Sequence, residues 1–414
     1  MKKISETIFL VIFILFFIWI SFFSSLIQPK YIVIILFFGF ISIIFLDKIN
    51  IKRLFIDKND LFLWSYIFIL TIGLNFAQNR DIAINKYYDY AIPALVVYFF
   101  FKSNIYLFKN KNEVALTICI LGAIVGFIGI LEHIFHRNLI YEIFIKNQYY
   151  IYYLSQGRVM STQYVPQVFG TYLAASSPFA CFLAFNANKK SLILIGIFCW
   201  LFILVGAFLS LERVAICAFT AATFIYLVFK NKKIALIFLL FIFSLLLVFS
   251  SSKDINKQRI SIGRYGFFNK EYHKYRITRF EIAGTIARHN IIWGVGLGNY
   301  KIVFNKYDKE PKEHNEYRKT PENMFLMMLC ESGVLGLLSF IGFLFLIISR
   351  ALPMIRMSSK YKEVISIALG GMVAILVTMM TYDSLYWRTP YFMFWFYCGI
   401  IMSLTGREEN VENI

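Results

Sequence analysis

The stretch TPENMFLMMLCESGVLGLLSFIGFLFLIISR, residues 320–350, decides the fold of this chain. Its polar start, which includes Glu322 and Asn323, passes directly into an apolar run of the length that crosses a bilayer as a helix. An ionisable group at the end of a membrane helix is costly, so Glu322 is a candidate functional residue. The stretch therefore predicts a membrane helix with a polar site at its mouth.

The composition extends this reading to the whole chain. Of its 414 residues, 59% are hydrophobic and 16% are charged, whereas soluble domains are about 45–50% apolar and about 25% charged. Lipid offers no partner to an open backbone, so the apolar runs are expected to cross as helices. The first run, 8–27, is too long for a signal peptide and lacks a cleavage site, so we expect it to be retained.

We predict an all-α, polytopic integral membrane protein with 12 transmembrane helices and a large outer loop before a late helix. The predicted spans are roughly 8–27, 31–47, 60–77, 87–102, 113–132, 166–186, 191–208, 213–229, 234–250, 323–349, 363–382 and 389–405. Three regions follow: 1–250 with spans one to nine, a basic outer loop over 251–322, and 323–414 with the last three spans.

Lys and Arg gather in every second short loop, as they do on the cytoplasmic side of membrane proteins. Lys2 and Lys3 place the N-terminus inside, and the alternation then places the C-terminus inside too. Two long loops, about 133–165 and 251–322, fall outside. Long loops cross regardless of their charge, so their basic content agrees with this orientation.

The loop 251–322 carries many of the basic residues behind the net charge of +18. Attraction to anionic lipid head groups explains such a loop, and a site for an anionic substrate explains it as well. Nucleic acid is not an expected partner, because the charge lies outside the membrane and no recognition module is visible.

Metal and cofactor motifs give no usable signal. All six cysteines fall in predicted spans and behave as small hydrophobic residues. His133 and His136 have a spacing that suits a metal, but the end of a membrane helix is the favoured interpretation. The fragment from Gly294 to Gly298 imitates a dinucleotide loop without its strand, so it predicts a tight turn. We expect no metal and no cofactor.

The unusual polar residues all fall on the predicted outer side. The candidate set is Arg158, Arg213, Arg276, Arg279, Glu322, Asn323, Asp383 and Arg388. Guanidinium groups bind phosphate oxygens bidentately and stay charged, so converging arginines suit a pyrophosphate leaving group. Arg388 is equally well explained as an interfacial anchor.

Glu322 has two interpretations. A carboxylate at a membrane interface can take the proton of an acceptor hydroxyl. An acid in the first turn of a helix also stabilises the helix dipole without any catalysis.

Four stretches resemble motifs of the O-antigen ligase and polymerase superfamily, membrane glycosyltransferases of the bacterial envelope. They are Arg158 through Gly170-Thr171-Tyr172, Ser210-Leu211-Glu212-Arg213, Arg279 with Ile292 to Tyr300, and Pro321-Glu322-Asn323 with Glu331, Gly333 and Gly336. The resemblance implies a GT-C-like fold in the cytoplasmic (inner) membrane with an active site on the outer, periplasmic side. It also implies an inverting, metal-independent transfer of a glycan from a polyprenyl-pyrophosphate carrier to a hydroxyl acceptor.

One position departs from the family pattern. Ligases of this family carry a histidine where this chain has Glu322, so the resemblance favours a polymerase of O-antigen or surface polysaccharide repeat units. Ligation of the glycan to lipid A-core is the alternative. His314 lies eight residues upstream and is a second candidate for the missing histidine.

A polysaccharide or lipid transporter is a third possibility, since such proteins also have about 12 spans. The two halves show no internal repeat, and the middle of the spans holds almost no ionisable residues. Polar clusters at the outer surface favour an enzyme that works there.

Overall fold

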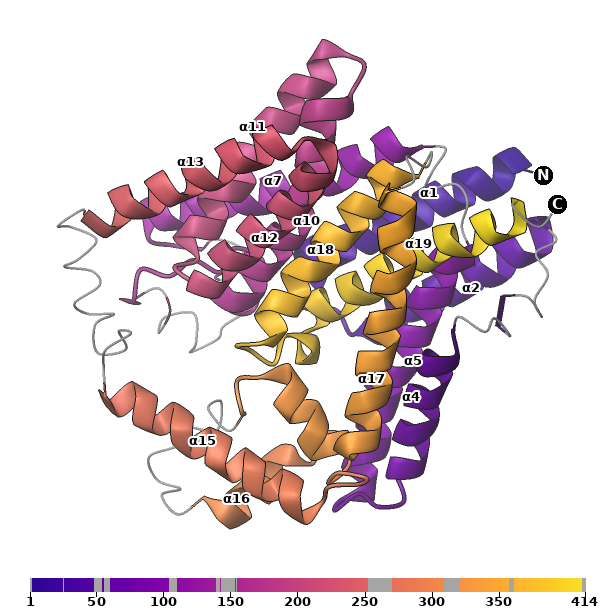
Figure 1. The fold of residues 1–414 in the computed structure, drawn as a ribbon, viewed down its shortest axis with the longest axis vertical. Helices are drawn as coiled ribbons and strands as arrows, with labels where there is room; N and C mark the ends of the chain where they lie inside the picture. The colour runs from indigo at the N-terminus through magenta and orange to yellow at the C-terminus, as the bar shows by residue number, and fades with distance from the viewer. Residues whose placement is uncertain are drawn as a thin grey trace.

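The computed structural model describes residues 2–24, 26–47, 54–55, 60–103, 110–138, 142, 153, 155–251, 270–308, 320–356 and 361–411. Within these ranges all regular structure is helical (Figure 1). The elements are α1 (Lys2–Ile18), the π-helix η1 (Trp19–Phe23), α2 (Pro29–Asp47), α4 (Leu61–Gly73), α5 (Arg80–Ser103), α7 (Lys111–Phe135), α10 (Pro166–Asn186), α11 (Lys190–Leu209), α12 (Arg213–Lys230), α13 (Lys232–Ser251), α15 (Lys270–His289), α16 (Tyr300–Tyr307), α17 (Met324–Arg356), α18 (Lys362–Met379), the short 3₁₀ turn η5 (Ser384–Tyr386) and α19 (Arg388–Val411).

The helical, multi-pass membrane class is confirmed. Eight helices in the described residues are long and apolar enough to cross a membrane. Each of the 12 predicted spans falls on a helix, but α4 is shorter than the usual span, with 13 residues. The count of 12 crossings therefore stays a prediction.

Helices packed around α10 build a large part of the body of the molecule. Helix α10 is almost wholly buried among α7, α11, α12 and α18 (Figure 1). Glycines allow the close approach: a Cβ on Gly126 would lie 2.6 Å from the carbonyl oxygen of Phe202, and one on Gly196 2.6 Å from the amide of Ala184. Membrane helices associate through such small residues because lipid supplies no hydrophobic drive between them.

Aromatic packing joins the N-terminal helices to the C-terminal one. The ring of Phe396 in α19 packs against Phe17 in α1 at 4.9 Å and Phe101 in α5 at 4.7 Å, both edge to face. Offset and edge-to-face pairs of this kind are favourable beyond the area they bury. The first and last spans thus lie side by side in the core.

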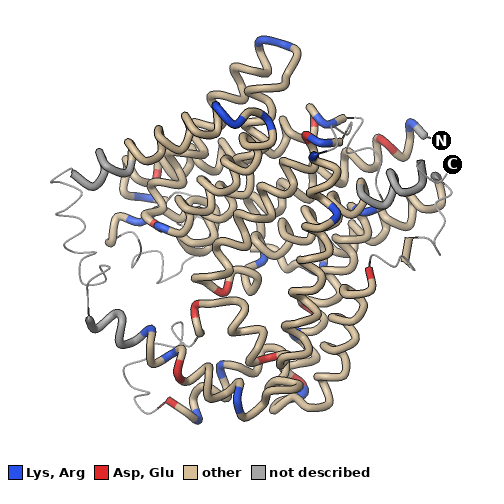
Figure 2. The backbone as a smooth tube through the Cα atoms, viewed as in Figure 1, with Lys and Arg blue, Asp and Glu red and all other residues tan. Residues whose placement is uncertain are grey.

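Contacts at the helix ends support the predicted alternation. Ends predicted to be cytoplasmic meet each other: Asn110 donates to Glu6 at 2.7 Å, and Lys111 pairs with Glu363 at 2.8 Å. The start of α1 and the end of α19 lie at one end of the molecule (Figure 1). Figure 2 shows Lys and Arg gathered at the ends of the long helices and along α15 and α16. Which of these ends faces the cytoplasm stays a prediction.

Lys102, the last residue of the predicted span 87–102, is buried. It is 8% exposed and pairs with the buried Asp60 at 2.5 Å, while Tyr98 donates to the same carboxylate at 2.6 Å. A buried charge needs a partner of this kind because desolvation is costly. The pair ties the first turn of α4 to the end of α5.

The second half of the predicted outer loop holds two helices, α15 and α16, that form a separate layer (Figure 1). Ile282, Ala283 and Ile286 of α15 pack with Val303 and Phe304 of α16. The same small core includes two residues from the first part of α17, Met327 and Cys330. The layer is thereby docked on the membrane body at the mouth of α17.

Helix α17 is broken at Gly333, where φ is 67° and ψ is −174°. This backbone conformation is essentially restricted to glycine. A Cβ at Gly333 would lie 2.1 Å from the carbonyl oxygen of Ile292, so the break also makes room for the turn before α16. The stretch at 320–350 is therefore a short helix followed by a long one.

Candidate active site

The stretches that carry the resemblance come together as two pairs in space. Arg158 forms an ion pair with Glu212, which joins the first stretch to the second. Arg279 forms an ion pair with Glu322, which joins the third to the fourth. Sequence order alone did not indicate which motif meets which.

Glu132 holds the loop that carries Arg158. Its carboxylate is 1% exposed and accepts hydrogen bonds from the Ser161 amide at 2.7 Å and the Asn138 side chain at 2.9 Å. Ser161 has a φ of 53°, in the left-handed region that side chains seldom adopt. The buried acid fixes this turn, and the turn carries Arg158 towards the start of α12.

The start of α12 is a second strained turn. Leu211 has a φ of 52°, and the Ser210 hydroxyl accepts the amide of Glu212 at 3.2 Å. A Cβ on Gly170 would lie 2.3 Å from the Cβ of Ala215, so α10 and α12 touch directly below the turn. Arg213 follows in the first turn of α12 and is exposed. This arrangement presents the Arg158–Glu212 pair and Arg213 at one corner of the body.

Glu322 lies between two arginines of α15. Nη1 of Arg279 donates to Oε1 of Glu322 at 2.5 Å, and Nε of Arg276 lies 3.8 Å from Oε2. Arg279 is 5% exposed. The Nε atoms of both arginines are buried and have no hydrogen-bond partner within the described part of the chain. Two guanidinium groups thus share one carboxylate and keep donors unused.

Backbone geometry fixes Glu322 at the mouth of α17. Its φ is 47°, and the next residue, Asn323, caps the helix by accepting the Leu326 amide at 2.9 Å. The Asn323 side chain also donates to the carbonyl of Met380 at 2.9 Å. Asn323 therefore acts as a helix cap and as a clamp to the end of α18.

The glycine-rich fragment is confirmed as a tight turn. Gly294, Gly296 and Gly298 have φ values of 71°, 90° and 73°. The turn lies against the break in α17: the amide of Gly296 donates to the carbonyl of Glu331 at 3.0 Å. A Cβ on Gly294 would lie 2.4 Å from the backbone carbon of Glu331, so no larger residue fits this approach.

Asn299, at the end of that turn, docks the layer on the α4–α5 connection. Its side chain accepts the amide of Asn79 at 2.9 Å and donates to the Asn79 carbonyl at 3.1 Å. The layer formed by α15 and α16 is thus fixed to the membrane body at two places, the mouth of α17 and the α4–α5 connection.

The α18–α19 connection lies between the two motif pairs. Tyr382 stacks on Trp387 at 6.1 Å, and burial raises the pKa of its phenol well above the usual value. The charges of Asp383, Tyr153 and Glu322 raise that pKa further. Tyr153 also lies under the guanidinium of Arg158 at 5.3 Å. Tyr382 is therefore within electrostatic reach of Glu322 and of Tyr153, the ring beneath Arg158.

Asp383 is a buried acid of this connection. Burial raises the pKa of its carboxyl from 3.8 to about 6, and the charge of Glu322 adds to the rise. A backbone hydrogen bond and the cations Lys301 and Arg279 oppose this rise in pKa.

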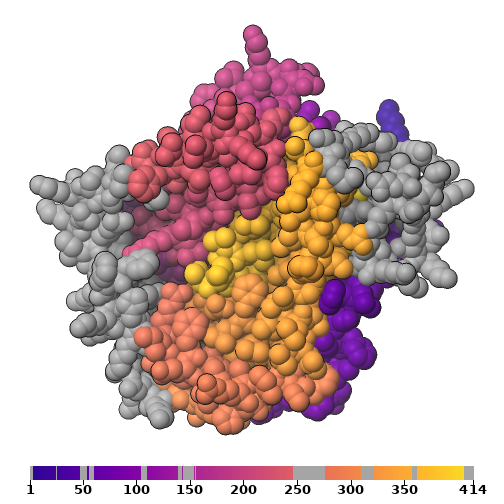
Figure 3. Space-filling model, in the orientation of Figure 1, coloured from indigo at the N-terminus to yellow at the C-terminus, as the bar shows by residue number. Residues whose placement is uncertain are grey.

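The space-filling view shows the yellow C-terminal helices between α12–α13 and the α15–α17 layer (Figure 3).

Residues 197–341 match the O-antigen ligase family. The match supports the O-antigen ligase and polymerase superfamily, and with the membrane helices it supports a function of that type in lipopolysaccharide biosynthesis. No curated protein matches the chain.

The O-antigen ligase match covers less than half of the chain and contains three of the four motifs. Arg213, Arg276, Arg279, Glu322 and Asn323 lie inside it. Arg158, Asp383 and Arg388 lie outside it, although the fold brings Arg158 to the second motif. His314 lies outside the described residues.

Arg388 binds the end of the first span. Its guanidinium donates to the carbonyl oxygens of Ser24 at 2.9 Å and Ile27 at 3.2 Å. A cation at these last carbonyls of a helix is favourable. The contacts fit the anchor interpretation of this residue.

Two buried acids were absent from the predicted site set. Glu132 holds the Arg158 loop, and Glu331 accepts the Tyr300 amide at 3.2 Å and the Tyr386 hydroxyl. Each is a lone carboxylate within a long apolar run, and that pattern is a usable signal for a functional or structural site. The described residues contain no group of three or more acids, histidines and cysteines that could hold a metal.

Proposed function

We propose that this protein is a membrane glycosyltransferase that transfers a glycan from a polyprenyl-pyrophosphate carrier to a hydroxyl acceptor on the outer face. Its favoured reaction joins repeat units of an O-antigen or another surface polysaccharide. The observation that carries the proposal is the cluster of Arg276, Arg279 and Glu322 at the mouth of α17, inside the O-antigen ligase match.

Arginine chemistry supports a pyrophosphate site. Arg276 and Arg279 have buried Nε donors that make no hydrogen bond within the described residues, and Glu322 neutralises only one of the two charges. Charge-assisted hydrogen bonds from guanidinium to phosphate are strong and directional. Arg158 and Arg213 would add the second half of the site from the opposite motif pair.

The reaction uses these groups in a defined order. The acceptor oxygen attacks the anomeric carbon from the face opposite the carrier, and the carbon–oxygen bond to the pyrophosphate breaks. The pyrophosphate leaves with the electron pair, and fixed cations stabilise its developing charge. The proton of the acceptor hydroxyl passes to Glu322. The products are an inverted glycosidic bond and the carrier pyrophosphate, in a GT-C-like enzyme that needs no metal.

Polymerisation is favoured over ligation by one residue. Glu322 stands where ligases of the family carry histidine, so a ligase mechanism lacks its usual group. Ligation to lipid A-core remains the second candidate function, because the family match itself is to O-antigen ligases.

The test uses purified protein in nanodiscs with a lipid-linked repeat unit as the only glycan. A ladder of longer lipid-linked products supports a polymerase, and product that forms only when lipid A-core is added supports a ligase. Arg279→Lys and Arg213→Lys keep the charge but lose the bidentate fork, so each should lower turnover at least tenfold. Arg288→Lys, at an exposed position of the same helix as Arg279, is the matched control. Wild-type turnover in both test variants would refute the pyrophosphate site.

A further inference from the structure

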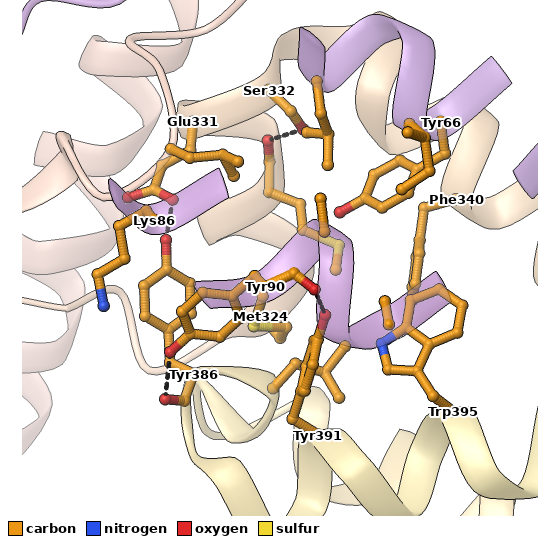
Figure 4. A pocket seen from close by; sticks show the side chains of 17 residues that line it. Tyr66, Lys86, Tyr90, Met324, Glu331, Ser332, Phe340, Tyr386, Tyr391 and Trp395 are labelled. Atoms are coloured by element: carbon orange, nitrogen blue, oxygen red, sulfur yellow. Dashed lines mark hydrogen bonds between the residues drawn. The ribbon is translucent and has the colours of Figure 1, made fainter. Parts of the chain in front are cut away.

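A small pocket lies between α4, α5, the broken part of α17 and the start of α19. Its wall includes the aromatic side chains of Tyr66, Tyr90, Tyr391 and Trp395 (Figure 4). Its volume is about 50 Å³. Since a water needs about 10–15 Å³ by a comparable measure, the pocket has room for a group of a few heavy atoms.

Two polar groups of the wall are available to an occupant of the pocket. The indole N–H of Trp395 is buried, with the residue 2% exposed, and it has no hydrogen-bond partner in the described ranges. The Tyr66 hydroxyl points into the pocket (Figure 4). Buried polar groups are normally hydrogen-bonded, so the Trp395 N–H indicates an occupant that supplies an acceptor. The Tyr66 hydroxyl is placed to bond to the same occupant.

The other tyrosines are already engaged. Tyr90 donates to the carbonyl of Tyr386 at 2.6 Å, and Tyr391 donates to the carbonyl of Tyr90. These bonds tie the wall together (Figure 4) and leave its shape well defined. The polar groups of the wall that remain available to an occupant are therefore the Tyr66 hydroxyl and the Trp395 N–H.

One end of the pocket is charged. Glu331 is 3% exposed, and Lys86 lies over the rings of Tyr90 at 5.0 Å and Tyr386 at 5.6 Å. Ala91, Ala94 and other apolar side chains also line the pocket. The pocket thus combines an apolar surface with hydrogen-bonding groups of both kinds.

We propose that this pocket is a specificity site for the acetamido group of an N-acetylated sugar in the acceptor glycan. The methyl of the group would contact the alanines, its carbonyl would accept from Trp395, and its N–H would meet Tyr66 or Glu331. The size of the pocket fits such a substituent and excludes a whole disaccharide. The inference rests on the proposed function, because it takes the ligand to be the glycosyl acceptor.

The position of the pocket relative to the arginine cluster supports an acceptor. The short helix 324–332 separates the two: Glu322 stands just before its start, and Glu331 lies near its end. Met324, next to Asn323, lines the pocket. A glycan that reaches from Glu322 along this short helix would place one substituent in the pocket.

Binding is measured without turnover, by saturation-transfer difference NMR on the full chain in nanodiscs. The probes are methyl 2-acetamido-2-deoxyglucoside and methyl glucoside, together with the corresponding galactosides. We expect at least one acetamido glycoside to bind about tenfold more tightly than its hydroxyl counterpart, the effect of one or two hydrogen bonds. Tyr66→Phe should lower this preference several-fold, and Ala91→Leu, which fills the pocket, should abolish it. Tyr88→Phe, at an exposed position of α5, is the matched control and should change nothing.

Other occupants give different results. The proposal would be overturned if the paired glycosides bound equally or if none of them bound. It would also be overturned if the Ala91→Leu variant kept the preference for an acetamido glycoside. Farnesyl phosphate that competes in the wild type but not in Ala91→Leu would assign the pocket to the carrier lipid and overturn it too. A chain that discriminates between glycosides but transfers no glycan would refute only the proposed function. A chain that polymerises without discriminating would refute only the pocket.

Discussion

Arg279 and Glu322 are 43 residues apart and form an ion pair with a 2.5 Å contact between Nη1 and Oε1. The pair brings a basic helix of the outer layer onto the mouth of a membrane helix. Arg276, one turn away on α15, flanks the same carboxylate at 3.8 Å. The proposed base is therefore held by the proposed pyrophosphate ligands, and a substrate must enter between them.

Glu322→Gln is the first prediction. A general base contributes about 10²–10⁴-fold, so turnover should fall by that order while carrier binding persists. Removing the acid also leaves Arg279 without its counter-charge, so some stability should be lost. Product formation and the melting temperature of the purified protein are measured together. Glu281→Gln, an exposed acid on α15, serves as the control.

Near-normal product from a folded Glu322→Gln protein would contradict the catalytic role. The residue would then be a structural partner of Arg276 and Arg279, as the helix-terminus interpretation requires. A variant with both Glu322→Gln and Arg279→Gln separates the two effects, because it removes the acid without leaving Arg279 unpaired.

Gly333→Ala is the second prediction. Alanine disfavours a φ of 67° with ψ near 180°, and its Cβ would overlap the Ile292 carbonyl. We expect a loss of at least about 1–3 kcal/mol, the cost of a strained backbone residue, seen as a lower melting temperature in detergent. Gly284→Ala in α15 is the control: its Cβ meets no atom within 4 Å, and alanine favours a helix. Equal melting temperatures for the two variants would show that the break in α17 tolerates a side chain.

Helices were predictable from sequence here, and their long-range partners were not. An apolar run such as 166–186 marks a helix without reference to the rest of the chain. The Arg158–Glu212 pair depends on how α10 and α12 pack, and no local pattern encodes that. The break at Gly333 falls inside an apolar run, so Glu331, Ser332 and Gly333 gave its only local signal. The Lys102–Asp60 pair joins the end of one predicted span to the start of another, so no local pattern reveals it.

Membrane orientation gives the third prediction. A cysteine introduced at Gly284 in α15 should react with an impermeant maleimide in intact cells. One introduced at Lys189, in the turn before α11, should react only after the cells are opened. The exposed native Cys217 is replaced by serine in both cases. The opposite labelling pattern would invert the orientation and remove the outer-face reaction.

The pH dependence of stability around Asp383 is the last prediction. The pKa of this buried carboxyl is raised from 3.8 to about 6, chiefly by burial. The folded state therefore binds the proton more tightly than the unfolded state. This contribution to stability is fully present below about pH 4 and is lost as the pH rises through about 6. A pKa difference of about two units between the folded and unfolded states corresponds to at most about 3 kcal/mol of stability.

Asp383→Asn removes the titration while it keeps the size of the side chain. Its melting temperature relative to the wild type should therefore rise between pH 4.5 and pH 7.5. Asp89→Asn, at an exposed position of α5, should show no such change. Scanning fluorimetry in detergent at several pH values measures both differences. A constant gap between Asp383→Asn and the wild type across this range would mean that Asp383 does not carry the raised pKa.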